Sequence, residues 1–152
     1  MSNEKRVIWL PQKTQEEFLK RSEYEALYGG AAGGGTSDAL LAEALRQVDI
    51  PYYRGIIFRK TYPQLSELED RSAMIYKAAY PKAEYNRTKH CWQFPSGAKI
   101  YFGAMQYGKD KLNYQGKHFD FVGFDELTQF SWEEYSYMFS RNRPGGPDTR
   151  VY

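Results

Sequence analysis

The sequence predicts a three-layer α/β fold, in which helices cover both faces of a mainly parallel β-sheet. The first observation behind this prediction is that short apolar runs, typical of buried strands, alternate along the chain with segments whose apolar residues recur at helical spacing. The second is that two of these runs lead directly into unusual segments, a glycine-rich stretch at 30–37 and an acidic pair at 125–126. Ligands of parallel α/β sheets bind beyond the carboxyl ends of the strands, so we expect both segments at one edge of the sheet.

The composition is that of one domain, 1–152, with a real hydrophobic core, because 41% of the 152 residues are hydrophobic. The 21 basic and 19 acidic side chains leave a formal net charge of +2, so any contact with DNA must be local. One cysteine excludes an intrachain disulfide, and with only two histidines beside it there is no spaced ligand set for structural zinc. No stretch approaches the roughly 20 apolar residues of a membrane helix, and we expect a cytosolic protein without membrane contact.

The first half of the chain is predicted to contain two strand–helix units. A short helix capped by Thr14 leads to an apolar run at 25–30, which the glycines stop, and a helix follows at 37–47. A buried strand is expected at 55–58. Pro63 is placed to open the next helix, which Pro81 ends and whose apolar face is Leu65, Leu68, Ile75 and Tyr76.

The second half begins with a predicted β-hairpin insertion between 84 and 103, made of two alternating runs about a Pro-Ser-Gly turn. Residues 104–117 are expected to form a loop, and the apolar run that starts at 118 is expected to be the strand that delivers the acidic pair. A last helix is predicted at about 131–141. The breaker cluster at 143–149 and the start of another strand at 150–152 predict that the domain is truncated at its C-terminus.

The glycine-rich stretch, "GAAGGGTS", fits the phosphate-loop template G-x-x-x-x-G-K-[ST] at both glycines and at the serine. Successive glycines let backbone N–H groups point inward, so that they and the N-terminus of the following helix can hold a polyphosphate, while the Ser37 hydroxyl can bind Mg²⁺. Thr36 stands where such loops carry a lysine, and threonine cannot supply that positive charge. A flexible glycine turn is the alternative. The predicted nucleotide-binding residues of the loop are Gly30, Ala31, Ala32, Gly33, Gly34, Gly35, Thr36 and Ser37.

The acidic pair supplies the other half of a hydrolytic nucleotide site. Asp125 is expected to hold Mg²⁺ through water, and Glu126 is expected to orient or deprotonate the attacking water. Two acids after an apolar strand are by themselves often a solvated strand end or a helix cap. A glycine loop between a strand and a helix, followed later by a strand with Asp-Glu, is a much less frequent coincidence and favours a site for ATP and Mg²⁺.

Four segments in order carry a resemblance to a known family: "TQEEFL", "YGGAAGGGTSDALL", "FRKTYPQL" and "YQGKHFDFVGFDEL". Together they resemble the N-terminal ATPase domain of the large terminase subunit of tailed bacteriophages. The resemblance implies a P-loop core of the additional-strand, RecA-like kind that hydrolyses ATP and drives double-stranded DNA into the viral capsid in the host cytoplasm. It also implies a ring-forming homo-oligomer on the portal protein, with a small terminase subunit as partner. The nuclease domain that most members carry is expected to be absent from these 152 residues.

Carried onto this sequence, the resemblance matches Gly30, Gly35 and Ser37 to the phosphate loop and the acidic pair to the Mg²⁺-binding and catalytic acids. Gln15 is similar to the glutamine that reads adenine, with a surface helix residue as the alternative. Many relatives have an arginine that reaches a neighbour's nucleotide, where this chain has Gln115. The remaining candidates for that arginine finger or for a DNA contact are Arg59, Lys60, Arg141 and Arg143.

Two further questions stay open at the level of sequence. The lysines at 109, 111 and 117 are either DNA contacts or part of a solvated loop, and we favour the solvated loop. Thr36 predicts an ATPase with impaired catalysis. The alternatives are a non-catalytic P-loop module that assembles with the portal, the small subunit or its own copies, and a relative of helicases.

Overall fold

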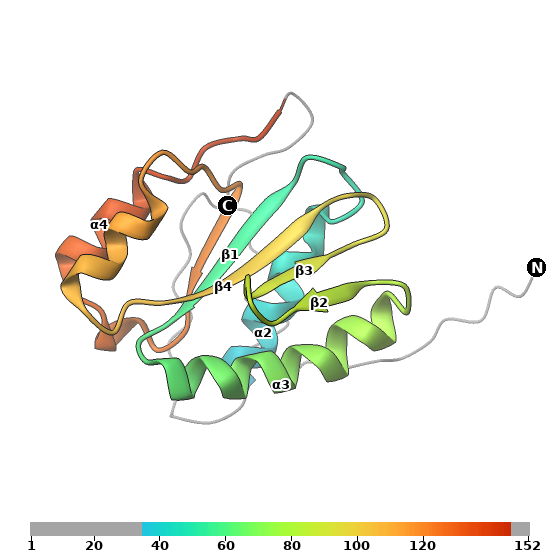
Figure 1. The fold of residues 1–152 in the computed structure, drawn as a ribbon, viewed down its shortest axis with the longest axis horizontal. Helices are drawn as coiled ribbons and strands as arrows, with labels where there is room; N and C mark the ends of the chain where they lie inside the picture. Colours follow the sequence, from blue (N-terminus) through green and yellow to red (C-terminus); the bar gives the residue numbers. More distant parts are fainter. Residues whose placement is uncertain (1–34, 147–152) are drawn as a thin grey trace, which may run out of the picture.

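The computed structural model describes residues 35–146 (Figure 1). The predicted helix after Thr14, the run at 25–30 and the strand at 150–152 lie outside the described residues, as do Gln15 and loop residues 30–34. Within residues 35–146, none of the helices is long and apolar enough to cross a bilayer.

Five strands form one sheet, in the order β2-β3-β4-β1-β5. Their bounds are Arg54–Arg59 for β1, Glu84–Asn86 for β2, Cys91–Gln93 for β3, Lys99–Ala104 for β4 and Phe121–Phe124 for β5. Strands β4 and β5 pair in parallel with the two edges of β1, whereas β3 is antiparallel to both β2 and β4. Only β3 therefore runs against the others, which confirms the prediction of a mainly parallel sheet.

Strands β3 and β4 pair as neighbours in sequence at the predicted Pro-Ser-Gly turn. Trp92 lies opposite Ile100, and Gly97 takes a φ of +101° in the turn, a conformation that favours glycine. Because β4 also pairs with β1, this pair of strands is continuous with the central sheet.

The helices are α2 (Gly35–Glu43), which continues as the 3-10 turn η1 (Ala44–Gln47), then α3 (Tyr62–Ala79) and α4 (Trp132–Phe139). Two further 3-10 turns are η2 (Gly108–Tyr114) and η3 (Leu127–Gln129). The loop predicted at 104–117 thus contains helical turns, and the Asp110 carboxylate accepts a hydrogen bond from the backbone N–H of Tyr107 at 2.8 Å. This side-chain contact stabilises the start of η2, which hydrophobic periodicity does not reveal.

Local sequence explains where α3 begins. The hydroxyl of Thr61 accepts a hydrogen bond from the backbone N–H of Gln64, and the Gln64 side chain accepts one from the N–H of Thr61. This capping box satisfies N–H groups that a helix start otherwise leaves unpaired. Pro63 lies in the first turn, and the four predicted apolar-face residues of α3 are buried. The predicted helix is confirmed.

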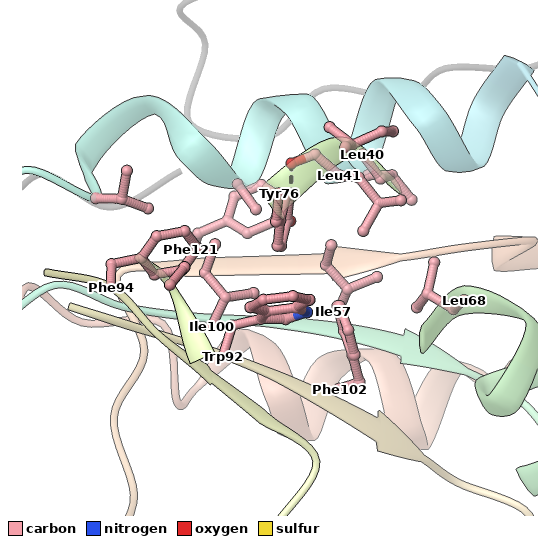
Figure 2. Packing of buried hydrophobic residues seen from close by; sticks show 14 of the residues in the cluster. Leu40, Leu41, Ile57, Leu68, Tyr76, Trp92, Phe94, Ile100, Phe102 and Phe121 are labelled. Atoms are coloured by element: carbon pink, nitrogen blue, oxygen red, sulfur yellow. Dashed lines mark hydrogen bonds between the residues drawn. The ribbon is translucent and has the colours of Figure 1, made fainter. Parts of the chain in front are cut away.

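The sheet is covered on both faces, because successive residues of its strands enter two different cores. Ile57 joins the cluster beneath α2 and α3, while Ile56 and Phe58 join the cluster beneath η2 and α4. Figure 2 shows the first cluster, in which the Tyr76 hydroxyl donates to the Leu41 carbonyl at 2.8 Å and ties α3 to α2. Helical elements therefore cover both faces of the sheet, with α2 and α3 over one face and η2 and α4 over the other.

Candidate functional site

The carboxyl end of the parallel strands brings together two residues that are 88 positions apart in the sequence. The Ser37 hydroxyl, in the first turn of α2, donates a hydrogen bond of 2.6 Å to Oδ2 of Asp125. Asp125 follows β5, and its backbone N–H donates to the Phe58 carbonyl of β1 at 2.9 Å, which continues the strand pairing by one residue. Its side chain is 1% exposed. The glycine-loop helix and the acidic strand therefore converge at one buried point.

Arg59, the last residue of β1, completes this cluster. Its Nη2 donates to the Ser37 hydroxyl at 2.8 Å, and its Nε forms an ion pair with Oδ2 of Asp125. Nη1 donates to the Gln64 carbonyl at 3.4 Å. Only 8% of Arg59 is exposed. A buried carboxylate is costly unless a positive charge compensates it, and here the guanidinium of the same chain does so.

The backbone changes to a left-handed conformation at Glu126, the residue after Asp125. It takes φ 59° and ψ 58°, the left-handed region that costs a non-glycine residue about 1–3 kcal/mol and is often found at functional sites. While Asp125 is buried, Glu126 is exposed. Its Oε2 accepts a hydrogen bond of 2.7 Å from the Gln129 amide in η3. The second acid is thus presented to solvent next to the first and is oriented by a neighbour that the sequence did not single out.

A second ion pair fixes the first turn of α2. Both oxygens of Asp38 accept hydrogen bonds of 2.7 Å from Arg71 of α3, in the two-pronged geometry that makes arginine–carboxylate pairs strong. The hydrogen bond to Asp38, followed by its charge, raises the pKa of Arg71. Sequence analysis missed this pair because the two residues lie 33 positions apart and neither is part of a motif. The contact holds Ser37, one residue before Asp38, at a set position over the sheet.

Lys60 points away from the cluster and binds Glu134 of α4, with its Nζ 2.9 Å from both carboxylate oxygens. The ammonium also lies 5.8 Å from the centre of the Phe130 ring. Burial raises the pKa of Glu134, but hydrogen bonds from Ser131 and Lys60 outweigh it, so the pKa lies below its ordinary value. Lys60 is therefore engaged within its own chain.

The two candidate arginines after α4 lie at the other end of β5. The Arg141 guanidinium stacks 5.7 Å from the centre of the Tyr137 ring, and the Arg143 backbone N–H donates to the Phe119 carbonyl just before β5. Asp125 follows the opposite end of that strand. The structure thus does not bring Arg141 or Arg143 to the Ser37–Asp125 cluster of the same chain.

The donor atoms of the cluster fit magnesium. A serine hydroxyl and a carboxylate oxygen are hard oxygen ligands, the kind that Mg²⁺ takes in company with water and phosphate oxygens. Within the part of the chain that the structure describes, no group of three or more His, Cys, Asp or Glu side chains could hold a metal on its own.

An open pocket of about 620 Å³ lies apart from this cluster, on the side of the sheet that carries Tyr101 and Phe119. Lys117 belongs to it and sits 6.0 Å from the centre of the Tyr114 ring. Its lining includes one arginine and two lysines and no carboxylate side chain. The lining residues are Arg54, Ile56, Lys89, His90, Tyr101, Phe102, Asn113, Tyr114, Lys117, His118 and Phe119.

Comparisons with known proteins concern the fold and the family of the chain. The family described as "Terminase large subunit, T4likevirus-type, N-terminal" matches residues 27–152. A solved structure of the large terminase from a thermophilic bacteriophage is similar in fold, with a TM-score of 0.63 at 14% sequence identity, over 91% of this chain and 37% of that one. This chain therefore spans well under half of that terminase, and no curated protein sequence matches it. The family match over most of its length shows that the chain belongs to the family of large terminase subunits, of which it corresponds to the N-terminal part.

Proposed function

We propose that this chain is the ATP-binding and ATP-hydrolysing motor domain of a phage large terminase, with a P-loop, RecA-like core, and that it acts in packaging DNA into the capsid. The observation that supports this most directly is the 2.6 Å contact between Ser37 and Asp125. A hydroxyl at the start of a helix after a glycine loop and an aspartate at the end of the neighbouring buried strand are the two protein ligands of Mg²⁺ in P-loop enzymes. Family membership supports the same assignment.

In this proposal, the backbone N–H groups of 30–36 and the N-terminus of α2 hold the phosphates of ATP, and Gln15 contacts the adenine. Ser37 and Asp125 would hold Mg²⁺, which when bound would supply positive charge to the phosphoryl group. Glu126 orients the attacking water and accepts its proton, and its exposed position beside Asp125 suits that role. The Gln129 amide keeps the Glu126 carboxylate in a single orientation.

Thr36 limits the rate in this proposal, because the loop lacks its usual lysine. The test is a titration of Mg²⁺-ATP together with steady-state phosphate release, for the chain as it is and for Thr36→Lys. We expect the lysine to raise turnover, and Glu126→Ala in the lysine background to abolish it, with a loss of about 100-fold or more. If neither form binds nucleotide, the proposal is wrong. If Glu126→Ala leaves turnover unchanged, the catalytic assignment is wrong.

The proposed substrate of the motor is double-stranded DNA, and we propose the pocket around Arg54, Lys89 and Lys117 as a contact for its backbone. Lysine and arginine side chains attract phosphates regardless of nucleic-acid sequence, and no carboxylate is among the residues that line this pocket. Lys111 is a poorer candidate because it forms an ion pair with Glu133. The test measures DNA binding against salt for Lys89→Ala/Lys117→Ala and for the control Lys82→Ala, an exposed lysine outside the pocket. The slope of log affinity against log salt should fall by about 2 in the double variant, one for each lost phosphate contact, and stay unchanged in the control.

A non-catalytic assembly module is the second candidate, and α4 supplies the observation that favours it. Trp132 is 78% exposed and Phe139 42% exposed, and Tyr135 packs between their rings. Exposed aromatic rings on one helix are typical of contacts with a protein partner. The candidate partners are the portal, the small terminase subunit or further copies of the chain in a ring. A portal complex that forms equally well with and without nucleotide, and that Trp132→Ala abolishes, would favour this candidate over the motor.

A further inference from the structure

We infer that Arg59 supplies, from within the same chain, the positive charge that Thr36 does not supply, and that the guanidinium moves from Asp125 to the terminal phosphate when nucleotide and Mg²⁺ bind. The inference rests on the proposed nucleotide site and goes beyond it by assigning a role to Arg59. It starts from the contact of Arg59 with both Ser37 and Asp125.

The first step is an inventory of the positive charges near the cluster. Arg71 is held by both oxygens of Asp38, and Lys60 is held by both oxygens of Glu134. These contacts commit both side chains to carboxylates that are not metal ligands in the proposed site. Arg59, in contrast, touches the two residues proposed to hold Mg²⁺. Among residues 35–146, it is the cation that the fold delivers to this point.

The second step is that the present partner of Arg59 is exchangeable. Asp125 is almost fully buried and needs a compensating cation, which the guanidinium provides in the ligand-free chain. Mg²⁺ at the same carboxylate provides that compensation instead, and two cations at one oxygen repel each other. Binding of the metal therefore weakens the hold of Asp125 on Arg59 and frees the guanidinium for another anion.

The third step concerns the destination of the freed guanidinium. Arg59 already contacts the Ser37 hydroxyl, which in a phosphate loop would lie close to the terminal phosphates. A guanidinium is always charged and presents a planar fork of donors that matches phosphate oxygens. Glu67, 3.8 Å from Nη1, is already in contact and is 79% exposed, so the new anion within reach of the freed guanidinium would be the nucleotide of the same chain.

Burial decides between this role and the arginine finger that the sequence suggested. A finger must extend from the surface into a neighbouring subunit, whereas Arg59 is 8% exposed. Its donors meet groups of its own chain, namely Ser37, Asp125, the Gln64 carbonyl and, at 3.8 Å, the exposed Glu67 carboxylate. The placement fits a residue that acts in cis.

A double-mutant cycle tests the inference, with the chain as it is, Thr36→Lys, Arg59→Met and the double variant. The readouts are the dissociation constants of a slowly hydrolysed ATP analogue and of ADP, each with Mg²⁺, and the melting temperature. We expect Arg59→Met to weaken the ATP analogue by about 10-fold or more and ADP by about 3-fold or less, because the lost contact is to the terminal phosphate. Thr36→Lys should restore binding in the Arg59→Met background, since both side chains supply the same charge.

Controls separate this role from a structural one. Arg59→Lys keeps the charge and should retain most of the preference for the ATP analogue over ADP, and Arg87→Met, at an exposed surface ion pair, should change neither constant. If Arg59→Met fails to fold, Arg59→Gln keeps hydrogen-bond donors next to Asp125 and replaces it in the cycle. Equal weakening of both nucleotides without rescue by Thr36→Lys, or no weakening at all, would overturn the inference. A chain that binds neither nucleotide in any form would instead overturn the proposed function.

Discussion

Two buried aspartates flank β5, and they are held in different ways. Asp120, before the strand, is fully buried and accepts hydrogen bonds from the backbone N–H groups of Arg54 at 2.9 Å and Gly145 at 2.6 Å. Asp125, after the strand, is held by the side chains of Ser37 and Arg59. The Asp120 carboxylate is therefore held by backbone N–H groups, and the Asp125 carboxylate by side chains.

The difference matches the roles that we propose, a structural one for Asp120 and metal binding for Asp125. Backbone N–H groups belong to the fold and cannot leave Asp120 without moving β1 and the segment around Gly145. A side chain added at Gly145 would meet the Tyr52 carbonyl at 2.9 Å and the Asp120 carboxylate at 3.2 Å, so the approach needs glycine. The partners of Asp125 are side chains, which can change rotamer without moving the backbone. In the proposed function, this freedom allows Asp125 to exchange them for a ligand.

The largest expected effect contrasts the two aspartates in turnover. In the Thr36→Lys background, Asp125→Asn should lower the rate of ATP hydrolysis by about 100-fold or more, because it removes a charged ligand of the metal. Asp120→Asn should lower the rate of ATP hydrolysis only as far as it lowers the fraction of protein that is folded. Phosphate release, corrected for folded protein by circular dichroism, is the measurement. Comparable losses in the two variants would show that the two aspartates do not differ in their role in turnover.

The next prediction compares the loss of a buried aspartate with the loss of an exposed one, measured as the free energy of unfolding. Asp120→Ala removes the buried carboxylate that accepts hydrogen bonds from two backbone N–H groups, and we expect the free energy of unfolding to fall by about 3 kcal/mol. Asp70→Ala, at an exposed ion pair with Arg87, should change it by less than about 0.5 kcal/mol. Urea denaturation followed by fluorescence measures both. A stable Asp120→Ala variant would show that the carboxylate does not organise the ends of β1 and β5.

Glu43, at the end of α2, extends the comparison to a third buried acid. Burial raises its pKa to about 7 even though the Arg46 guanidinium, 2.8 Å away, lowers it. Because the folded pKa lies above the unfolded one, the contribution of Glu43 to stability is present below about pH 4.5 and is lost as the pH rises through 7. We expect Glu43→Gln to flatten the pH dependence of unfolding between about pH 5 and 8 by about 1–2 kcal/mol, after allowance for solvent screening. Parallel pH curves for the chain and the variant would contradict the assignment.

The smallest expected effect concerns a contact that is local in sequence. Thr61→Ala removes half of the capping box of α3 and should lower the free energy of unfolding by about 1 kcal/mol. Thr88→Ala, at an exposed turn, should have almost no effect. Thermal melts compare the two variants. A loss well above this size would indicate that Thr61 also positions Arg59, two residues earlier.

The elements of the described region were predictable because their signals are local. The helical spacing of Leu65, Leu68, Ile75 and Tyr76 predicts α3, and the alternating runs about the Pro-Ser-Gly turn predict the pairing of β3 with β4. The helix predicted at about 131–141 appears as α4, with Ser131 as its N-cap. The segment of η2 was predicted as loop. Its start is stabilised by a side-chain cap from Asp110, and such a cap gives no hydrophobic periodicity in the sequence.

The residues of the proposed site could be chosen from the sequence alone, because a glycine loop with Ser37 and a strand with Asp125 are patterns of adjacent residues. The sequence also determined that Thr36 leaves the loop without its lysine. The sequence did not show which basic side chain contacts Ser37 and Asp125, and the fold does. Arg59, Lys60 and Arg71 are chemically similar basic residues, of which Arg71 was not a candidate in the sequence. The strand pairing and the packing of α3 and α4 direct Arg59 to Ser37 and Asp125, Lys60 to Glu134 and Arg71 to Asp38. The partner of a long side chain depends on which elements the fold brings within a few ångströms of it, and sequence separation does not encode that distance.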